Sequence, residues 1–125
     1  MTSGLSVGLA IYNLLNGAIP GVRKVYPVVS DDATMPYIVY RRQAMETALP
    51  KDGTAADTVM VELQVVTDTY TRGVQIAEAV REIMDGAQLV DEETGVNVRR
   101  VRLMTSEEGW QANAFIQFMT FKIMM

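Results

Sequence analysis

Residues 58–86 read TVMVELQVVTDTYTRGVQIAEAVREIMDG, and this stretch decides the fold. Its first part alternates apolar side chains with mostly polar ones, as in a strand with one buried face. The alternating apolar positions are Val59, Val61, Leu63 and Val65. After a polar break, apolar residues recur at helical spacing as far as Met84, with Arg and Glu on the other face. Gly86 ends the predicted helix, because glycine adopts the left-handed conformation without steric cost.

Length and composition set the class of protein. The chain has 125 residues, 49% of them hydrophobic and 21% charged, which predicts a folded globular protein with a single domain, residues 1–125. The long uncharged segment from Gly4 to Val22 is interrupted by Asn16, Gly17 and Pro20, so we expect no membrane span. No basic residue precedes it, so we expect no signal peptide and no secretion by that route.

The chain contains no cysteine and no histidine. These absences exclude disulfides, thiol nucleophiles, zinc sites of the usual ligands and the commonest general base. The net charge of −4 argues against general nucleic-acid binding, which depends on an excess of Lys and Arg. Composition therefore favours a structural or binding role over catalysis.

The N-terminal segment is predicted to form an apolar helix capped by Ser3 and ended by Asn16-Gly17. One stripe of this helix is wide enough to be covered on more than one side. The stripe comprises Leu5, Leu9, Tyr12 and Leu15, widened by Val7, Ile11 and Leu14. We expect it to pack in the core, and a partner-binding helix is the alternative.

A short strand closed by Pro27 and a longer one over residues 37–45 come next. The longer strand turns polar halfway, so its far end is expected to project beyond the core. The connection from Glu46 to Asp57 exceeds an ordinary hairpin loop, and loops of this length are often contact sites. Its candidate interface residues are Glu46, Leu49, Pro50, Lys51 and Asp52.

The C-terminal third is predicted to be all strand. A small hairpin with an acidic tip at residues 91–95 leads into residues 96–104, where Arg100 and Arg102 share one face. That face is expected to be solvated or paired within the chain, with a protein interface and, less favoured, nucleic-acid binding as the alternatives. Met124 and Met125 end the chain, where burial within one copy is difficult. These two arginines and two methionines complete the candidate interface residues.

Residues 105–109 are predicted to form an acidic turn, after which Trp110 opens the last strand as a packing anchor. The last strand carries apolar groups on both faces, for example Phe121 on one and Phe118 on the other. A strand that is apolar on two sides must be covered twice. Two helices can cover one face of the sheet, so a second copy of the chain could cover the other.

Motifs for chemistry are missing. The glycines lack the spacing of a phosphate-binding loop, and the adjacent pairs Glu92-Glu93 and Glu107-Glu108 do not suit paired carboxylate catalysis. Asp31-Asp32 lacks the oxygen ligands that Ca²⁺ needs, and Asp68 or Thr69 is better explained as a helix cap. We therefore predict no catalytic residues, no metal and no cofactor.

Together these patterns predict an α+β fold. Its core is a mainly antiparallel sheet of four to five strands with two helices packed on one face. The expected order is helix, strand, strand, strand, helix, strand, strand.

In this order and in its local wording the chain resembles the tail completion proteins of siphophages and prophages, which act in head-to-tail joining or as tail terminators. The resemblance covers nearly the whole chain, and its motifs follow the N-terminal helix. They are Val25-Tyr26-Pro27, Met35-Pro36-Tyr37-Ile38-Val39-Tyr40, residues 59–66, residues 73–80 and Phe115-Ile116-Gln117-Phe118. The Met-rich C-terminus and the lack of histidine have no counterpart that links them to this family.

The resemblance implies a virion structural protein, assembled in the bacterial cytoplasm, that forms a homo-oligomeric ring at the head-proximal end of a long tail. A hexamer is the expected ring, and the implied partners are the tail tube protein and the head connector protein. No membrane and no sequence-specific nucleic acid are expected as partners. Two alternatives stay open: another head–tail connector or tail-tube assembly protein, and a small ligand-binding regulatory domain with Trp110 and Tyr40 lining its pocket.

Overall fold

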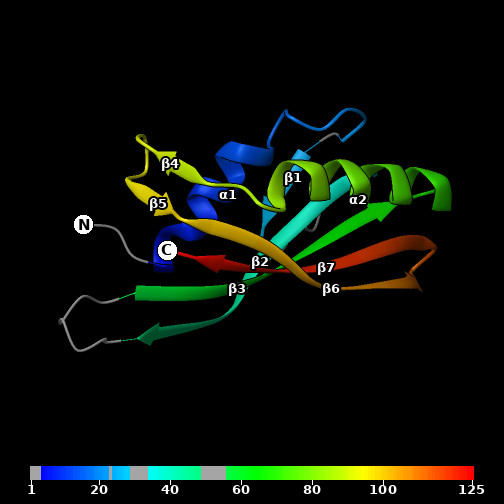
Figure 1. The fold of residues 1–125 in the computed structure, drawn as a ribbon. Coiled ribbons are helices and arrows are strands. Elements are labelled where there is room, and N and C mark those ends of the chain that lie inside the picture. Colours follow the sequence, from blue (N-terminus) through cyan, green and yellow to red (C-terminus); the bar gives the residue numbers. More distant parts are fainter. Residues whose placement is uncertain (1–3, 23, 29–33, 49–55) are drawn as a thin grey trace.

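The computed structural model describes residues 4–22, 24–28, 34–48 and 56–125. A 3₁₀ turn η1 (Gly4–Ser6) leads into helix α1 (Val7–Leu15), and helix α2 (Tyr70–Met84) follows the third strand (Figure 1). The strands are β1 (Lys24–Pro27), β2 (Tyr37–Ala48), β3 (Ala56–Thr67), β4 (Leu89–Asp91), β5 (Val96–Val98), β6 (Arg100–Gln111) and β7 (Ala114–Met124).

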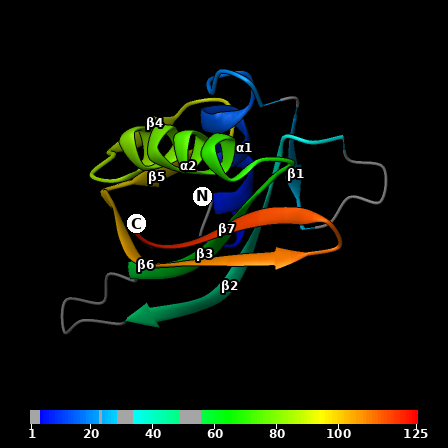
Figure 2. The same ribbon diagram turned by 90° about the vertical axis from the view of Figure 1, so that its right-hand side faces the viewer.

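Five strands form one sheet in the order β1-β2-β3-β7-β6, and β4 and β5 pair separately. β1 runs parallel to β2, whereas all the other neighbours in the sheet are antiparallel. Both helices lie on the same face of this sheet, which gives two layers (Figures 1 and 2). The predicted α+β class, the mainly antiparallel sheet and the order of elements are confirmed.

The hydrophobic core lies between the helices and the two central strands. The apolar positions predicted in β3 (Val59, Val61, Leu63 and Val65) are all fully buried and face the helices. Their partners in β7 include Phe121 and Ile123, which are also inaccessible to water. Burying one such side chain contributes about 1.5–3 kcal/mol, so this strand pair carries a large share of the fold's stability.

Helix α2 forms as its sequence predicts. The Thr69 side chain accepts a hydrogen bond from the Arg72 N–H and caps the first turn. Gly86 adopts a φ of +81° just past the last turn, and its N–H donates to the Val101 carbonyl of β6. The apolar face is buried through Ile76, Val80 and Met84, while the charged face is exposed.

Helix α1 departs from its prediction in two respects. The helix begins at Val7 after η1, and Ser3, the expected cap, lies outside the described residues. The side chains that enter the core are Val7, Ala10, Ile11 and Leu15. Leu5 and Leu9, expected in the core, are 63% and 60% exposed. The helix is apolar on nearly every side, so periodicity alone did not show which face meets the sheet.

The long connection predicted from Glu46 to Asp57 is shorter than expected. β2 and β3 continue to pair through Glu46↔Thr58, Thr47↔Asp57 and Ala48↔Ala56. Antiparallel pairing persists because each added pair satisfies further backbone hydrogen bonds, even where few side chains are buried. Apart from half-buried Met45, the side chains over residues 41–48 are exposed, which confirms that the far end of β2 projects from the core (Figure 1).

The acidic turn predicted at residues 105–109 is wrong. These residues belong to β6, and the chain reverses instead at Ala112 and Asn113, whose φ angles are +51° and +62°. Two residues of positive φ between paired strands form the hairpin turn that matches the twist of the sheet. Ala112 is an unusual residue at such a position, so Asn113 is the only residue of the pair that favours this turn.

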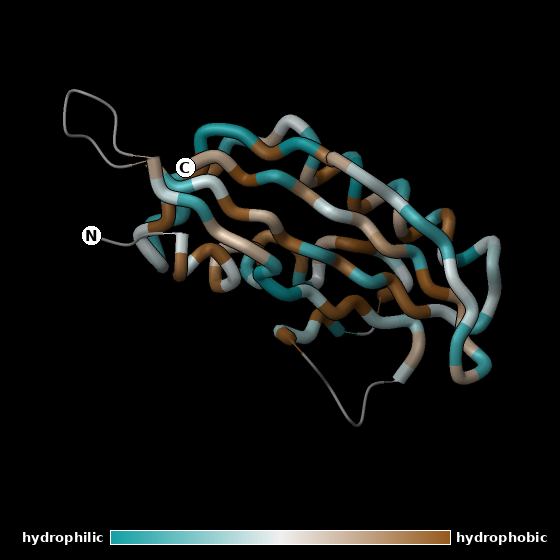
Figure 3. The backbone as a smooth tube through the Cα atoms, turned by 90° about the horizontal axis from the view of Figure 1, so that it is seen from below, coloured by the Kyte–Doolittle hydropathy of each residue, from teal (hydrophilic) through white to brown (hydrophobic). Residues whose placement is uncertain are grey.

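Two β-bulges interrupt the sheet at adjacent levels, one in β2 and one in β6. One interrupts β2 between Arg42 and Ala44, and the other interrupts β6 between Leu103 and Thr105. Both adjoin the level at which Val61 of β3 pairs with Phe121 of β7. Seen from the side away from the helices, polar and apolar residues mix along all the long strands (Figure 3).

Candidate assembly surfaces

The predicted interface residues fall into separate places. Glu46 is exposed near the end of β2, whereas Leu49, Pro50, Lys51 and Asp52 lie outside the described residues. Arg100 and Arg102 are exposed on the sheet face opposite the helices, and Arg102 pairs across the strands with Lys122. Like charges in opposed positions destabilise a sheet slightly, so this corner would gain from an anionic neighbour.

The two terminal methionines are half-buried within one copy of the chain. Met124 lies in β7 between Thr58 and Arg100. Met125 packs against the core, and its N–H donates to the Asp57 carbonyl at 3.0 Å. The expectation that these residues are difficult to bury within the monomer therefore holds only in part.

Asp57 fastens the N-terminus to the base of the β2–β3 hairpin. Its carboxylate accepts hydrogen bonds of 2.7 Å from the Thr47 hydroxyl and from the Gly4 N–H. The Thr47 bond, followed by that of Gly4, lowers the pKa of Asp57 below its ordinary value. A Cβ at Gly4 would lie 2.7 Å from Val59 Cγ2, so this approach requires glycine. These contacts hold Gly4 against the base of the β2–β3 hairpin.

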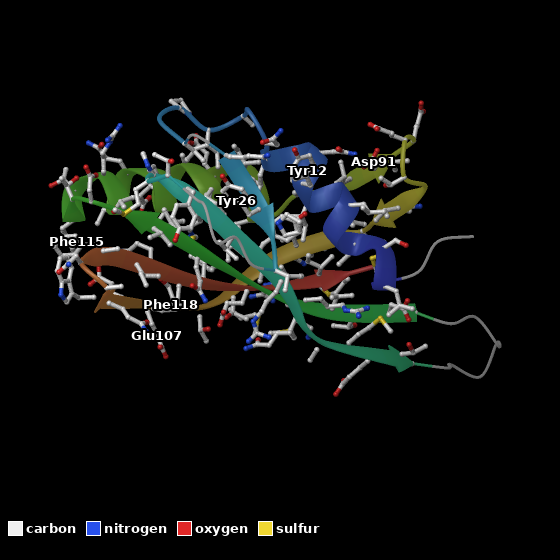
Figure 4. All side chains as sticks on the ribbon, turned by 180° about the vertical axis from the view of Figure 1, so that it is seen from behind. Tyr12, Tyr26, Asp91, Glu107, Phe115 and Phe118 are labelled. Carbon is white, nitrogen blue, oxygen red and sulfur yellow. The ribbon has the colours of Figure 1, made fainter. Side chains whose placement is uncertain are left out.

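An apolar groove of about 570 Å³ runs beside the outer face of α1. Its walls come from α1, from the end of β1, from the β2 edge and from the β4–β5 turn. Apolar lining residues are Leu5, Leu9, Tyr12, Val28 and Tyr40, and charged ones at the rim are Arg41, Arg42 and Glu93. Figure 4 shows Tyr12 of α1 and Asp91 at the end of β4 on the same side of the molecule. Sequence reasoning missed Val28, which is 65% exposed with a φ of +63°.

Hydrogen bonds hold the groove's parts together. The Tyr40 hydroxyl donates to the Gly8 carbonyl at 2.8 Å and ties β2 to α1. Burial, with a smaller contribution from Tyr12, raises the pKa of Tyr40 to about 12, so the hydroxyl keeps its proton. Asn13 of α1 donates to Asp91 at 3.2 Å, which places the β4–β5 turn over the helix. The groove is therefore preformed.

The opposite end of the sheet carries an aromatic cluster. Trp110 and Tyr70 both contact Phe115 edge to face, with ring centroids 4.6 and 5.9 Å apart. The Tyr70 hydroxyl donates to Glu108 at 2.5 Å, and this bond is the main cause of the lowered pKa of Glu108. Trp110 is 58% exposed, so the prediction of a buried packing anchor is wrong. Its position at a hairpin end leaves Trp110 in contact with Phe115 but largely exposed.

On each side of the sheet, one strand has a covered and an unpaired length of edge: β6 on one side, and β2, which the short β1 covers in part, on the other. On β6, the C-terminus of α2 covers the first part, where Gly86 N–H donates to the Val101 carbonyl and Leu103 N–H donates to Asp85. Beyond Leu103, no described residue donates to or accepts from the outer edge over residues 104–111. On β2, β1 pairs with Tyr37–Tyr40 and the Val28 N–H donates to the Tyr40 carbonyl, and no described residue pairs with the outer edge over residues 41–48.

The described residues show no arrangement for chemistry. Among them, no three Asp or Glu residues gather as metal ligands. No buried side-chain nitrogen or oxygen in the described part of the chain lacks a hydrogen-bond partner. Trp110 and Tyr40 do not share a pocket, because Tyr40 lines the α1 groove and Trp110 does not. Of the helices that the structure describes, none has the length and apolar run needed to cross a membrane.

Comparison with known proteins shows the family to which this chain belongs. The family model for "Tail completion protein gp17" matches residues 5–121, nearly the whole chain. The chain belongs to the tail completion protein gp17 family. This family membership makes the chain a structural protein of a phage tail, and it confirms the family resemblance. A search of curated proteins found no match.

The fold of this tail completion protein also occurs in a solved virion. A chain from the "Virion of native gene transfer agent (GTA) particle" superposes with a TM-score of 0.67 at 15% sequence identity. The match covers 98% of this chain and 84% of that chain. At this identity the likeness concerns the fold alone, which is thus one found in a phage-like particle.

Proposed function

We propose that this tail completion protein forms a homo-oligomeric ring, with six copies expected, at the head-proximal end of a long phage tail. The ring ends polymerisation of the tail tube protein and presents a docking surface to the head connector protein. It acts by binding and has no catalytic role. It is assembled in the host cytoplasm and remains in the virion.

One observation carries this proposal: on opposite sides of the sheet, the part of the chain that the structure describes leaves one length of the β2 edge and one length of the β6 edge unpaired. A free edge presents unpaired backbone groups that bind another strand, and soluble proteins normally block such edges. Two different edges on one copy support head-to-tail contacts, and such contacts close into a ring when the rotation allows it. Membership of a tail completion family makes the tail end the natural place for such a ring.

The proposal is tested by removing the protein from a phage and examining the particles by electron microscopy. Loss of a terminator should give tails of uncontrolled length that are not joined to heads. Tails of normal length without heads would instead favour a connector, and the absence of tubes would favour a tube subunit. Rings with a central hole, seen for the purified protein or at tail ends, are the expected positive result.

Residues 50–55 provide a second test of the contact role predicted for the β2–β3 connection. Deleting them should leave the circular dichroism spectrum unchanged and prevent joining of heads to tails. A matched control replaces exposed Glu92 in the β4–β5 turn with Ser, which should not affect joining. Normal joining in the deletion variant would reject the assignment of this connection to assembly.

A small ligand-binding domain is the weaker alternative. The α1 groove is apolar and of the size that small ligands use, but its two candidate aromatic residues are not together. Saturable binding of a small molecule in the groove of a strictly monomeric protein would favour that alternative.

A further inference from the structure

The two free edges are equal in length and run in opposite directions. The free edge of β2 covers residues 41–48 and that of β6 covers residues 104–111. β2, β3, β7 and β6 alternate in direction, so β6 runs antiparallel to β2. A second copy beside the first, with its helices on the same side, therefore presents its β6 antiparallel to the first copy's β2.

We infer that neighbouring copies join by pairing the free edge of β2 in one copy with the free edge of β6 in the next. This inference rests on the proposed ring and names the contact that builds it. The resulting sheet continues from copy to copy, with all helices on one side. The partner at this surface is thus a second copy of the chain, bound head to tail.

The two free edges lie at different heights, which fixes a stagger between copies. Tyr40 lies level with Leu63, Met119 and Ser106 across the sheet, and the two free edges extend from this level in opposite directions. Placing Thr47 beside the next copy's Ser106 shifts that copy by about 20 Å along the strands at roughly 3.3 Å per residue. The sideways step of four strand spacings is about 19 Å, so the strands tilt by about 45°, near the upper end of the range for closed barrels.

This placement brings the next copy up to the end of β1. The hairpin turn of the next copy, at Ala112 and Asn113, arrives where β1 ends at Pro27. Beyond the other end of the paired segment, the α2 C-terminus that covers Val101 and Leu103 lies past the end of β2. The covered part of each edge is therefore the part that the neighbour does not need.

Side chains on the helix side of the new pair complement one another. Trp110 of the next copy would lie beside Arg42 at the rim of the α1 groove, where a guanidinium can stack on an indole. Leu9 and Val28 in the groove and Trp110 are large apolar side chains left exposed by the single copy. The contact would cover all three, and Arg42 would reach Glu108 diagonally across the strands.

The opposite side of the pair contains one unfavourable contact. The same register places Glu46 opposite Glu107 of the next copy, and opposed carboxylates destabilise a strand pair. Both residues are exposed in the single copy. Removing one of these charges should therefore strengthen assembly, a result that a purely solvent-exposed Glu46 would not give.

Cross-linking tests the inference directly, because the chain has no cysteine of its own. Opposed residues in antiparallel strands have Cα atoms about 4.5–5.5 Å apart, within the range of a disulfide. T47C alone and S106C alone should give no dimers, their mixture should give dimers only, and the double variant should give a ladder up to the closed ring. T47C combined with Q75C, on the exposed face of α2, is the control and should give no ladder.

The outcomes separate this inference from the proposed function. Rings in the electron microscope without cross-links, or dimers from a single variant alone, would reject the β2–β6 contact while the ring stands. Absence of rings, with heads and tails joined normally without the protein, would reject the proposed function itself. A ladder from the double variant supports both.

A second variant tests the register. E46Q should lower the protein concentration for half-assembly by about threefold at low salt, and added salt should reduce this gain by screening. E78Q removes an exposed carboxylate from α2 and should leave assembly unchanged. Equal effects of the two variants, or weaker assembly of E46Q, would reject the proposed register.

Discussion

The two helices cover the same sheet face but differ in their outer sides. α2 buries Ile76 and Val80 and turns a charged face to water, as a helix that is complete within one copy does. α1 buries Ile11 and Leu15, yet Leu9 on its outer side and Leu5 in the preceding turn η1 are exposed beside an apolar groove. An exposed apolar face of this kind is typical of a surface that binds a partner.

The two helices also differ in how their first turns are stabilised. α2 begins with a side-chain cap from Thr69, whereas the N-cap of α1, Ser6, makes no side-chain cap bond. α1 is held from outside instead, through Tyr40 at Gly8 and through Asp57 at Gly4. One helix is stabilised by its own sequence and the other by the sheet beneath it.

The largest expected effect on stability comes from a substitution on the buried face of α1, compared with one on its exposed face. Leu15→Ala removes a fully buried side chain and should lower the free energy of unfolding by about 2–5 kcal/mol. Leu9→Ala alters the exposed face and should change it by less than about 0.5 kcal/mol while weakening assembly. Chemical denaturation with light scattering measures both, and a strongly destabilised Leu9 variant would show that this face is core after all.

Removing the tie between β2 and α1 should have a smaller effect. Tyr40→Phe keeps the ring but loses the hydrogen bond to the Gly8 carbonyl, which should cost about 1 kcal/mol. Tyr12→Phe, in which no described partner bond is lost, is the control. Equal unfolding midpoints for the two variants would mean that the sheet does not hold α1 through Tyr40.

The helix caps should differ by less. Thr69→Ala removes the cap of α2 and should cost about 0.5–1 kcal/mol, since the capping bond is long at 3.4 Å. Ser6→Ala removes no capping bond and should be nearly neutral. A larger cost at Ser6 than at Thr69 in thermal unfolding would reverse the contrast between the helices.

The smallest expected effects concern the dependence of stability on pH in acid. The pKa values of Asp57 and Glu108 are lowered in the fold, so their stabilising contributions are complete above the unfolded pKa values near 4 and are lost as pH falls through the folded ones. Asp57→Asn and Glu108→Gln should therefore flatten the dependence of stability on pH below about 5. Unchanged slopes in denaturation curves between pH 5 and 3 would contradict these assignments.

Much of the fold was predictable because the central elements obey one period each. The alternation from Val59 to Val65 fits only a strand with one buried face, and the spacing from Ile76 to Met84 fits only a helix with one buried face. The hairpin turn at Ala112-Asn113 was not predictable, because alanine rarely adopts a positive φ. The burial of α1 was not predictable either, because its apolar residues surround the helix.

The candidate assembly surfaces were predictable only in part. The exposure of Arg100 and Arg102 followed from alternation, as expected for a strand with one buried face. The free edges did not follow, because an edge depends on strand order, and β7 inserts between β3 and β6 although it comes last in the chain. Local sequence carries no record of that insertion.

The paired bulges have a mechanical consequence. They bend only β2 and β6, while Val61 and Phe121 keep β3 and β7 in unbroken register between them. The length of the β2–β3 hairpin beyond the Val61–Phe121 pair can therefore vary independently of the core. Adding two residues to each of its strands would lengthen it by about 7 Å and leave every core side chain on its own face. Reach can thus change without repacking the helices.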